Sequence, residues 1–132
     1  MTQEDAVIQF IQQLDSDMIN TLLDEGRTYQ DMKKDIFIRK LGYAFDEFLD
    51  SGDKELTYKP GKCEAPMCNY QCIGYSFTGN TSGKHIDLII EKETNGKVID
   101  LYECKFFLCD GVRNIKPGLE LTANKLMFHV RA

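Results

Sequence analysis

The first part of the chain has the hydrophobic spacing of an amphipathic helix. In "TQEDAVIQFIQQL" the apolar residues Val7, Ile8 and Ile11 recur at steps of three and four. Thr2 precedes them as an N-cap, because its hydroxyl can accept a hydrogen bond from the first turn. We therefore expect a helix that begins at about residue 3.

Two further helices are predicted before residue 51. "MINTLLDEG" predicts a short one ended by Gly26, and the longest should run from residue 32 to 49 with Asp31 as its N-cap. Tyr29 lies between them in a short extended link, where we expect a buried aromatic ring. The apolar stripe of the long helix consists of Phe37, Ile38, Leu41, Ala44, Phe45 and Phe48.

From Glu55 the pattern changes from helical to alternating, which is typical of β-strands. "ELTYKPG" predicts a strand ended by Pro60-Gly61, and "YQCIGYSFTGN" a second strand. "TGNTSGK" lacks the spacing of a phosphate-binding loop and leads into another strand, so we expect a turn there.

The segment "HIDLIIEKETNGKVIDLYECKFF" predicts a β-hairpin, and its register decides which side chains share a face. If Asn95-Gly96 alone forms the loop, Asp87 lies opposite Cys104 and points away from Glu103. A three-residue loop with a bulge instead places Asp87 opposite Glu103, on one face. The apolar pattern favours the first register, because that register gathers more of the isoleucine and leucine residues on one side. The second register remains open.

Helices followed by antiparallel strands indicate an α+β fold, with the N-terminal helices packed on one face of a curved antiparallel sheet. The 132 residues are enough for one domain. We expect helices over about 3–51, strands over about 55–107 and a C-terminal tail over 108–132 whose structure the pattern leaves open.

Composition and charge narrow the range of partners. The chain is 42% hydrophobic and 28% charged, with a net charge of −5, which argues against a general nucleic-acid binder. No apolar run reaches the roughly 18 residues of a membrane span, and the start "MTQEDAVIQF" lacks the pattern of a signal peptide. We therefore expect a cytoplasmic protein without a membrane partner.

Asp87 followed by Glu103-x-Lys105 is the first candidate for chemistry. Paired carboxylates can hold Mg²⁺ while a lysine activates the attacking water. This arrangement resembles the PD-(D/E)xK nuclease pattern, with a helical residue such as Glu47 as an extra ligand. The chain departs from that pattern because no proline precedes Asp87. Ordinary charges on a solvated strand face are the alternative interpretation.

His85 and Asp87 are two residues apart on one expected strand, so their side chains share a face. Such a pair can serve in acid/base catalysis in a sheet-lined pocket, with Tyr29 or Tyr102 nearby. A histidine with a purely structural role is the alternative.

Three of the five cysteines lie close together in "CEAPMCNYQC", namely Cys63, Cys68 and Cys72. Thiolates are good zinc ligands, but the two-residue spacing of a zinc knuckle is absent. A zinc site, a disulfide and free thiols therefore all remain open.

The order of short helices, "LLDEGRTYQDMKKDIFIRKLGYAFDEF" and successive hairpins resembles small bacterial proteins of the nuclear-transport-factor-2-like, cystatin-like cone fold. The resemblance implies a pocket between the helices and a bent sheet, and an oligomer formed through the other sheet surface. It implies no particular activity. We expect a module that binds an unidentified small molecule or protein, with the nuclease-like site and the acid/base pair as alternatives.

Overall fold

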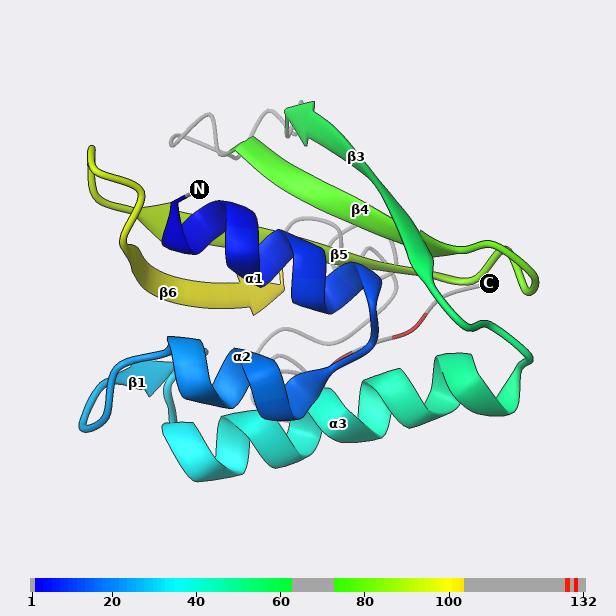
Figure 1. Ribbon diagram of the computed structural model, residues 1–132, viewed down its shortest axis with the longest axis horizontal. Coiled ribbons are helices and arrows are strands. Elements are labelled where there is room, and N and C mark those ends of the chain that lie inside the picture. Colours follow the sequence, from blue (N-terminus) through cyan, green and yellow to red (C-terminus); the bar gives the residue numbers. More distant parts are fainter. Residues whose placement is uncertain (1, 63–72, 104–127, 129, 131–132) are drawn as a thin grey trace, which may run out of the picture.

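The computed structural model describes residues 2–62, 73–103, 128 and 130, and the following account concerns these residues. Three helices precede a four-stranded antiparallel sheet, as the sequence predicted (Figure 1). The strands follow one another in the order β3-β4-β5-β6, so each strand pairs with its neighbour in the chain. The sheet is open, with β3 and β6 at its edges.

The first two helices are α1 (Gln3–Gln12) and α2 (Ser16–Leu22). Thr2 caps α1 as predicted, and a capping box with Asp5 satisfies the backbone at both residues. Asp15 caps α2 through the backbone N–H of Met18, at 3.1 Å. This helix ends at Leu22 and not at Gly26, because the chain turns extended at Leu23.

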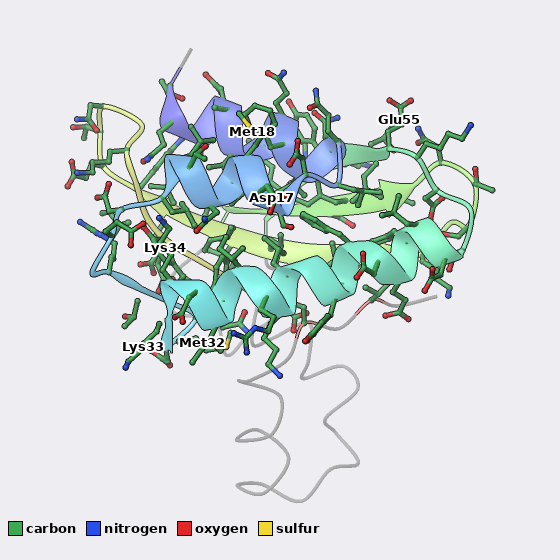
Figure 2. All side chains as sticks on the ribbon, turned by 60° about the horizontal axis from the view of Figure 1, so that its bottom comes forward. Asp17, Met18, Met32, Lys33, Lys34 and Glu55 are labelled. Carbon is green, nitrogen blue, oxygen red and sulfur yellow. The ribbon has the colours of Figure 1, made fainter. Side chains whose placement is uncertain are left out.

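The long helix α3 (Lys34–Asp50) buries the predicted apolar stripe, except that Ile38 is half-buried. The prediction that Asp31 caps it was wrong. The N-cap position is Lys33, and Asp31 instead forms a turn between two short strands, β1 (Thr28–Tyr29) and β2 (Met32–Lys33). Figure 2 shows Met32, Lys33 and Lys34 together where this hairpin passes into α3.

The sheet strands are β3 (Leu56–Lys62), β4 (Ile73–Gly79), β5 (His85–Lys92) and β6 (Val98–Glu103). The prediction that Pro60-Gly61 ends the first strand was wrong, because β3 continues to Lys62. Proline has no N–H to donate, and an edge strand tolerates it where that position faces away from the neighbouring strand.

The β5–β6 hairpin combines features of both predicted registers. At its turn, Glu93 N donates to Lys97 O at 2.8 Å, and Gly96 has φ +84°, as in a three-residue loop with a bulge. A second irregularity between Glu91 and Lys92 restores the other register, and Leu88 pairs with Glu103 along the strand body. The register that the apolar pattern favoured is therefore the one that orients the strand side chains.

The sheet has one face toward the helices and one face away from them. We call the first the helix face; it contributes Leu56, Phe77, Ile86, Leu88, Ile90 and Leu101 to the same core as the helices. We call the second the polar face; it carries Thr57, Ser76, Thr78, His85, Asp87, Glu91 and Tyr102.

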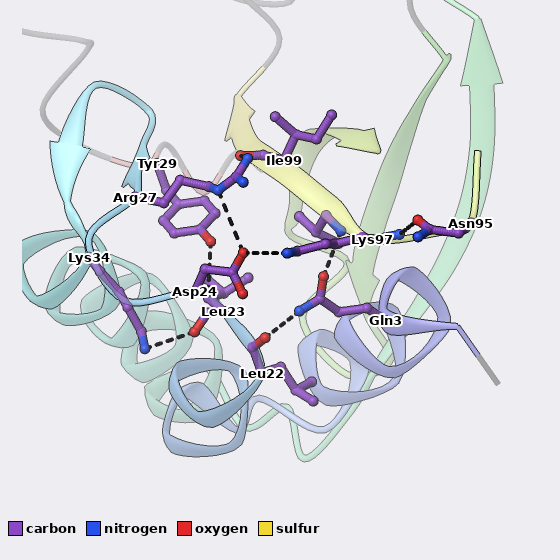
Figure 3. Close-up of polar contacts among 11 residues, drawn as sticks. Gln3, Leu22, Leu23, Asp24, Arg27, Tyr29, Lys34, Asn95, Lys97 and Ile99 are labelled. Atoms are coloured by element: carbon purple, nitrogen blue, oxygen red, sulfur yellow. Dashed lines mark hydrogen bonds and ion pairs between the residues drawn. The ribbon is translucent and has the colours of Figure 1, made fainter. Parts of the chain in front are cut away.

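Side chains from distant segments cover the backbone of the edge strand β6. Gln3 joins α1 to this strand, because it donates to Leu22 O and accepts a bond from Val98 N at 2.6 Å. Arg27 donates to Ile99 O at 3.4 Å. Figure 3 shows this region together with Lys34, the first residue of α3, whose Nζ donates to the carbonyl of Leu23 just after α2. The helices are thereby attached to one edge of the sheet.

Candidate functional site

The structure brings His85 and Asp87 into direct contact on the polar face. His85 Nδ1 lies 3.2 Å from Asp87 Oδ1 and 3.1 Å from Asp87 Oδ2. The side chain of Asp87 is only 5% exposed, whereas that of His85 is 31% exposed. A buried carboxylate thus orients a partly exposed imidazole, which is one arrangement that can serve acid/base chemistry.

Hydroxyl side chains lie next to this pair on the neighbouring strand. Ser76 pairs with Asp87 and Thr78 pairs with His85 across β4 and β5. Residues directly opposite in an antiparallel sheet have Cβ atoms about 5 Å apart. The His85–Asp87 pair and these two hydroxyls therefore form a compact polar array, which we call the dyad site.

The dyad site does not include Glu103. The pairing of Leu88 with Glu103 places the Glu103 side chain on the helix face, while Asp87 lies on the polar face. The third residue of the nuclease-like pattern, Lys105, lies outside the described residues, and Glu47 is exposed on α3. Since one metal ion cannot bridge two carboxylates on opposite faces, Asp87 and Glu103 do not form a shared site in this register.

The two candidate tyrosines lie in different layers. Tyr29 is fully buried against Phe37, with ring centroids 5.5 Å apart, and its hydroxyl accepts a bond from Asp24 N at 3.0 Å. Burial raises the pKa of the Tyr29 hydroxyl. Tyr102 lies on the polar face, where its hydroxyl donates to Glu91 Oε1 at 2.7 Å. Of the two, only Tyr102 shares a face with the dyad site.

The cysteines proposed as zinc ligands, Cys63, Cys68 and Cys72, lie outside the described residues. Within residues 2–62 and 73–103, no group of three or more His, Cys, Asp or Glu side chains is arranged to hold a metal ion.

A second polar cluster, on the helix face, was not predicted. Lys92 Nζ lies 2.7 Å from Glu4 Oε1, and the Tyr75 hydroxyl donates to Glu4 Oε2 at 3.4 Å. Burial and then the Glu4 carboxylate raise the pKa of Tyr75, while the hydrogen bond with Glu4 raises the pKa of Lys92. An acidic residue in the first turn of a helix, such as Glu4, is already explained by its favourable interaction with the helix N-terminus. The sequence around Glu4 therefore gave no sign that its partners lie 71 and 88 residues away.

A third cluster holds the turn between β4 and β5, also without a sequence signal. The buried Asp53 carboxylate accepts bonds from Thr81 N at 2.7 Å and from Ser82 N at 2.8 Å, and a further bond from the Ser82 hydroxyl. Burial raises the pKa of Asp53, but the hydrogen bonds from Ser82 and Thr81 outweigh it and hold the pKa below its usual value. The segment "TGNTSGK" forms the turn between β4 and β5, as predicted. The backbone N–H groups of Thr81 and Ser82 in this turn donate to Asp53 of the chain itself.

Comparison with known proteins adds no assignment to this geometry. No protein-family model, curated protein or solved structure matches the chain. In the part of the chain that the structure describes, none of the helices has the length and apolar character needed to cross a membrane.

Proposed function

We propose that the chain is a binding module for a small polar ligand, and that the dyad site holds this ligand. The contact between His85 Nδ1 and the buried Asp87 carboxylate, at 3.1 to 3.2 Å, is the observation that supports the proposal most strongly. A carboxylate is costly to bury, and such groups are retained where they are paired or where they bind something.

The donors and acceptors of the site favour a ligand with N–H or O–H groups. A carboxylate can accept about four hydrogen bonds, and the described structure places one donor, His85, beside Asp87. The hydroxyls of Ser76 and Thr78 can each donate and accept. An amine, amide or polyol could donate hydrogen bonds to the Asp87 carboxylate and exchange hydrogen bonds with the two hydroxyls. A simple anion has no donor for the carboxylate and would be repelled by it.

Backbone NMR spectra of the labelled protein test this proposal, with ethanolamine, acetamide and glucose as probes and acetate as the probe without a donor. We expect the donor-bearing probes to shift the amide signals of Ser76, Thr78 and His85. Asp87→Asn should abolish these shifts. Glu91→Gln is the matched control, because it removes a carboxylate from the same face of the same strand and leaves the dyad intact. Shifts that acetate also produces, or that survive Asp87→Asn, would reject the site.

Acid/base catalysis by the same pair is the second candidate function. With Nδ1 directed to Asp87, the carboxylate orients the ring, and the other ring nitrogen of His85 is left for a substrate. The hydrolysis of p-nitrophenyl acetate tests this candidate. The protein should exceed free imidazole by about tenfold or more, and Asp87→Asn should remove the excess. A rate equal to that of imidazole would leave binding as the function.

Two broader proposals depend on the element order and on composition. A cone-like sheet of the nuclear-transport-factor-2-like type is supported by the succession of helices and antiparallel strands. A cytoplasmic location is supported by the five cysteines, which a reducing compartment would keep as thiols. The nuclease-like alternative has only residue types in its favour, because its two carboxylates lie on opposite faces.

A further inference from the structure

The two edges of the sheet differ in how their backbone groups are used. At β6, side chains hydrogen-bond the backbone at four residues: Gln3 at Val98, Arg27 at Ile99, Asp100 at Leu101 and Gln30 at Glu103. These side chains therefore occupy backbone groups that an added strand would need. On the outer side of β3, one such contact is present among the described residues, from Gln12 Nε2 to Leu56 O at 3.3 Å.

The backbone of Tyr58 points toward the open side of β3. Glu55 O accepts a bond from Asn80 N, so it faces β4, whereas Leu56 O faces Gln12 on the outer side. Backbone groups alternate along a strand, so Tyr58 and Pro60 face outward together with Leu56. The Tyr58 side chain is 44% exposed, although it packs against Tyr75 with ring centroids 5.9 Å apart.

We propose that β3 pairs antiparallel with β3 of a second copy of this chain, about a two-fold axis at Tyr58. In this register Tyr58 exchanges both backbone hydrogen bonds with the partner's Tyr58. Leu56 N donates to the carbonyl of the partner's Pro60. Pro60 has no N–H to return to the partner's Leu56, but Gln12 already supplies a donor to that carbonyl. Gln12 therefore supplies the hydrogen bond to Leu56 O that Pro60 of the partner subunit cannot donate.

The two registers that are shifted toward the C-terminus fit less well. A shift of one residue toward the C-terminus places Lys59 directly opposite the partner's Lys59, and like charges in that position repel. A further shift places the two Pro60 residues opposite each other, where neither can donate. The register centred on Tyr58 instead places Lys59 opposite the partner's Thr57 and brings the exposed Tyr58 rings together.

A single strand pair is smaller than the roughly 1,200 to 2,000 Å² interface of a stable complex. We therefore expect self-association with a dissociation constant of about 10 μM to 1 mM. This dimer is independent of the proposed ligand site, because it uses the edge of β3 and not the face of β5.

Sedimentation velocity of the full chain across that concentration range tests the proposal, with reductant present because of the five cysteines. Thr57 is exposed and lies opposite the partner's Lys59 in this register. Thr57→Glu should therefore tighten the dimer about three- to tenfold, and Thr57→Lys should weaken it by a similar factor. Thr57→Gln is the uncharged control.

Amide signals in NMR spectra of a dilution series locate the contact. The Leu56 and Tyr58 amides should move with protein concentration, while those of Val98 and Leu101 on the covered edge should not. A wild-type protein and a Thr57→Glu variant that are both monomeric at the highest concentration would overturn the proposal. So would a dimer that responds alike to the acidic and the basic substitution.

Discussion

Replacement of Asp53 is predicted to loosen the junction between the end of α3 and the β4–β5 turn. The carboxylate is 1% exposed and accepts two backbone hydrogen bonds and one from a hydroxyl. A hydrogen bond to a charged group contributes about 1.5 to 3 kcal/mol. Thr81 is exposed and Ser82 is half-buried, so water can replace part of what is lost. We therefore expect Asp53→Ala to cost about 2 kcal/mol of unfolding free energy.

Asp53→Asn separates the charge from the shape of this side chain. It keeps one acceptor oxygen for the two backbone N–H groups, so its cost should be about 1 kcal/mol. The pKa of Asp53 is lowered in the folded protein, so its contribution is present above the unfolded pKa of about 3.9 and is lost as pH falls through the lower folded pKa. The difference between wild type and Asp53→Asn should therefore shrink in acid.

Urea unfolding at pH 7 and at about pH 3 measures both effects. Gly79→Ala supplies an independent check, because a Cβ at Gly79 would overlap the Asp53 carboxylate. This substitution should cost at least about 1 kcal/mol less in an Asp53→Ala background than in wild type. If Asp53→Ala stays within about 0.5 kcal/mol of wild type, the turn does not depend on this carboxylate and the reasoning fails.

Three further substitutions test other parts of the fold, each by urea unfolding. Lys34→Met should cost about 1 to 2 kcal/mol, because Lys34 Nζ donates to Leu23 O at 2.9 Å and that carbonyl would lose its donor; an unchanged midpoint would contradict this. Burial raises the pKa of Asp100 despite bonds from backbone N–H groups, so Asp100→Asn should be more stable than wild type at pH 7. That gain in stability should vanish below the unfolded pKa of the aspartate, where the side chain is neutral in wild type and in the variant alike. A gain that persists in acid would show that the cost of burying the Asp100 charge is not its cause. Gly96→Ala should cost about 2 kcal/mol or more, because Gly96 has φ +84° and packs against Thr2; a loss below about 0.5 kcal/mol would be inconsistent with that contact.

Local patterns were sufficient to predict the helices and most of the sheet. The cap at Thr2 and the stripe of α3 depend on residues a few positions apart, and the structure has both. The failures lie where a local signal was overridden. A proline normally ends a strand, but β3 continues through Pro60. It can do so because β3 is an edge strand and the backbone nitrogen of Pro60 points away from β4, where no hydrogen bond is needed. Asp31 has the chemistry of a helix cap, but it lies in a turn with φ +59°.

The candidate site was predicted in part. His85 and Asp87 were expected on one face because they are two residues apart, and that period is a property of any strand. Whether Glu103 lies on the same face depended on a bulge that follows the turn and shifts the strand register. The Asn95-Gly96 pair predicts the turn but not this bulge. The contacts of Glu4 and Asp53 depend on tertiary packing, so no pattern within a short window could have shown them.

The tautomer of His85 tests the central claim most directly. If Nδ1 donates to the Asp87 carboxylate, the neutral ring must carry its proton on Nδ1 and leave Nε2 unprotonated. Long-range ¹H–¹⁵N correlation spectra of the labelled protein with the His85 ring in its neutral form distinguish the two tautomers. We predict the Nδ1–H form in wild type and a shift toward Nε2–H in Asp87→Ala. An Nε2–H tautomer in the wild-type protein would contradict the His85–Asp87 contact on which the proposed site depends.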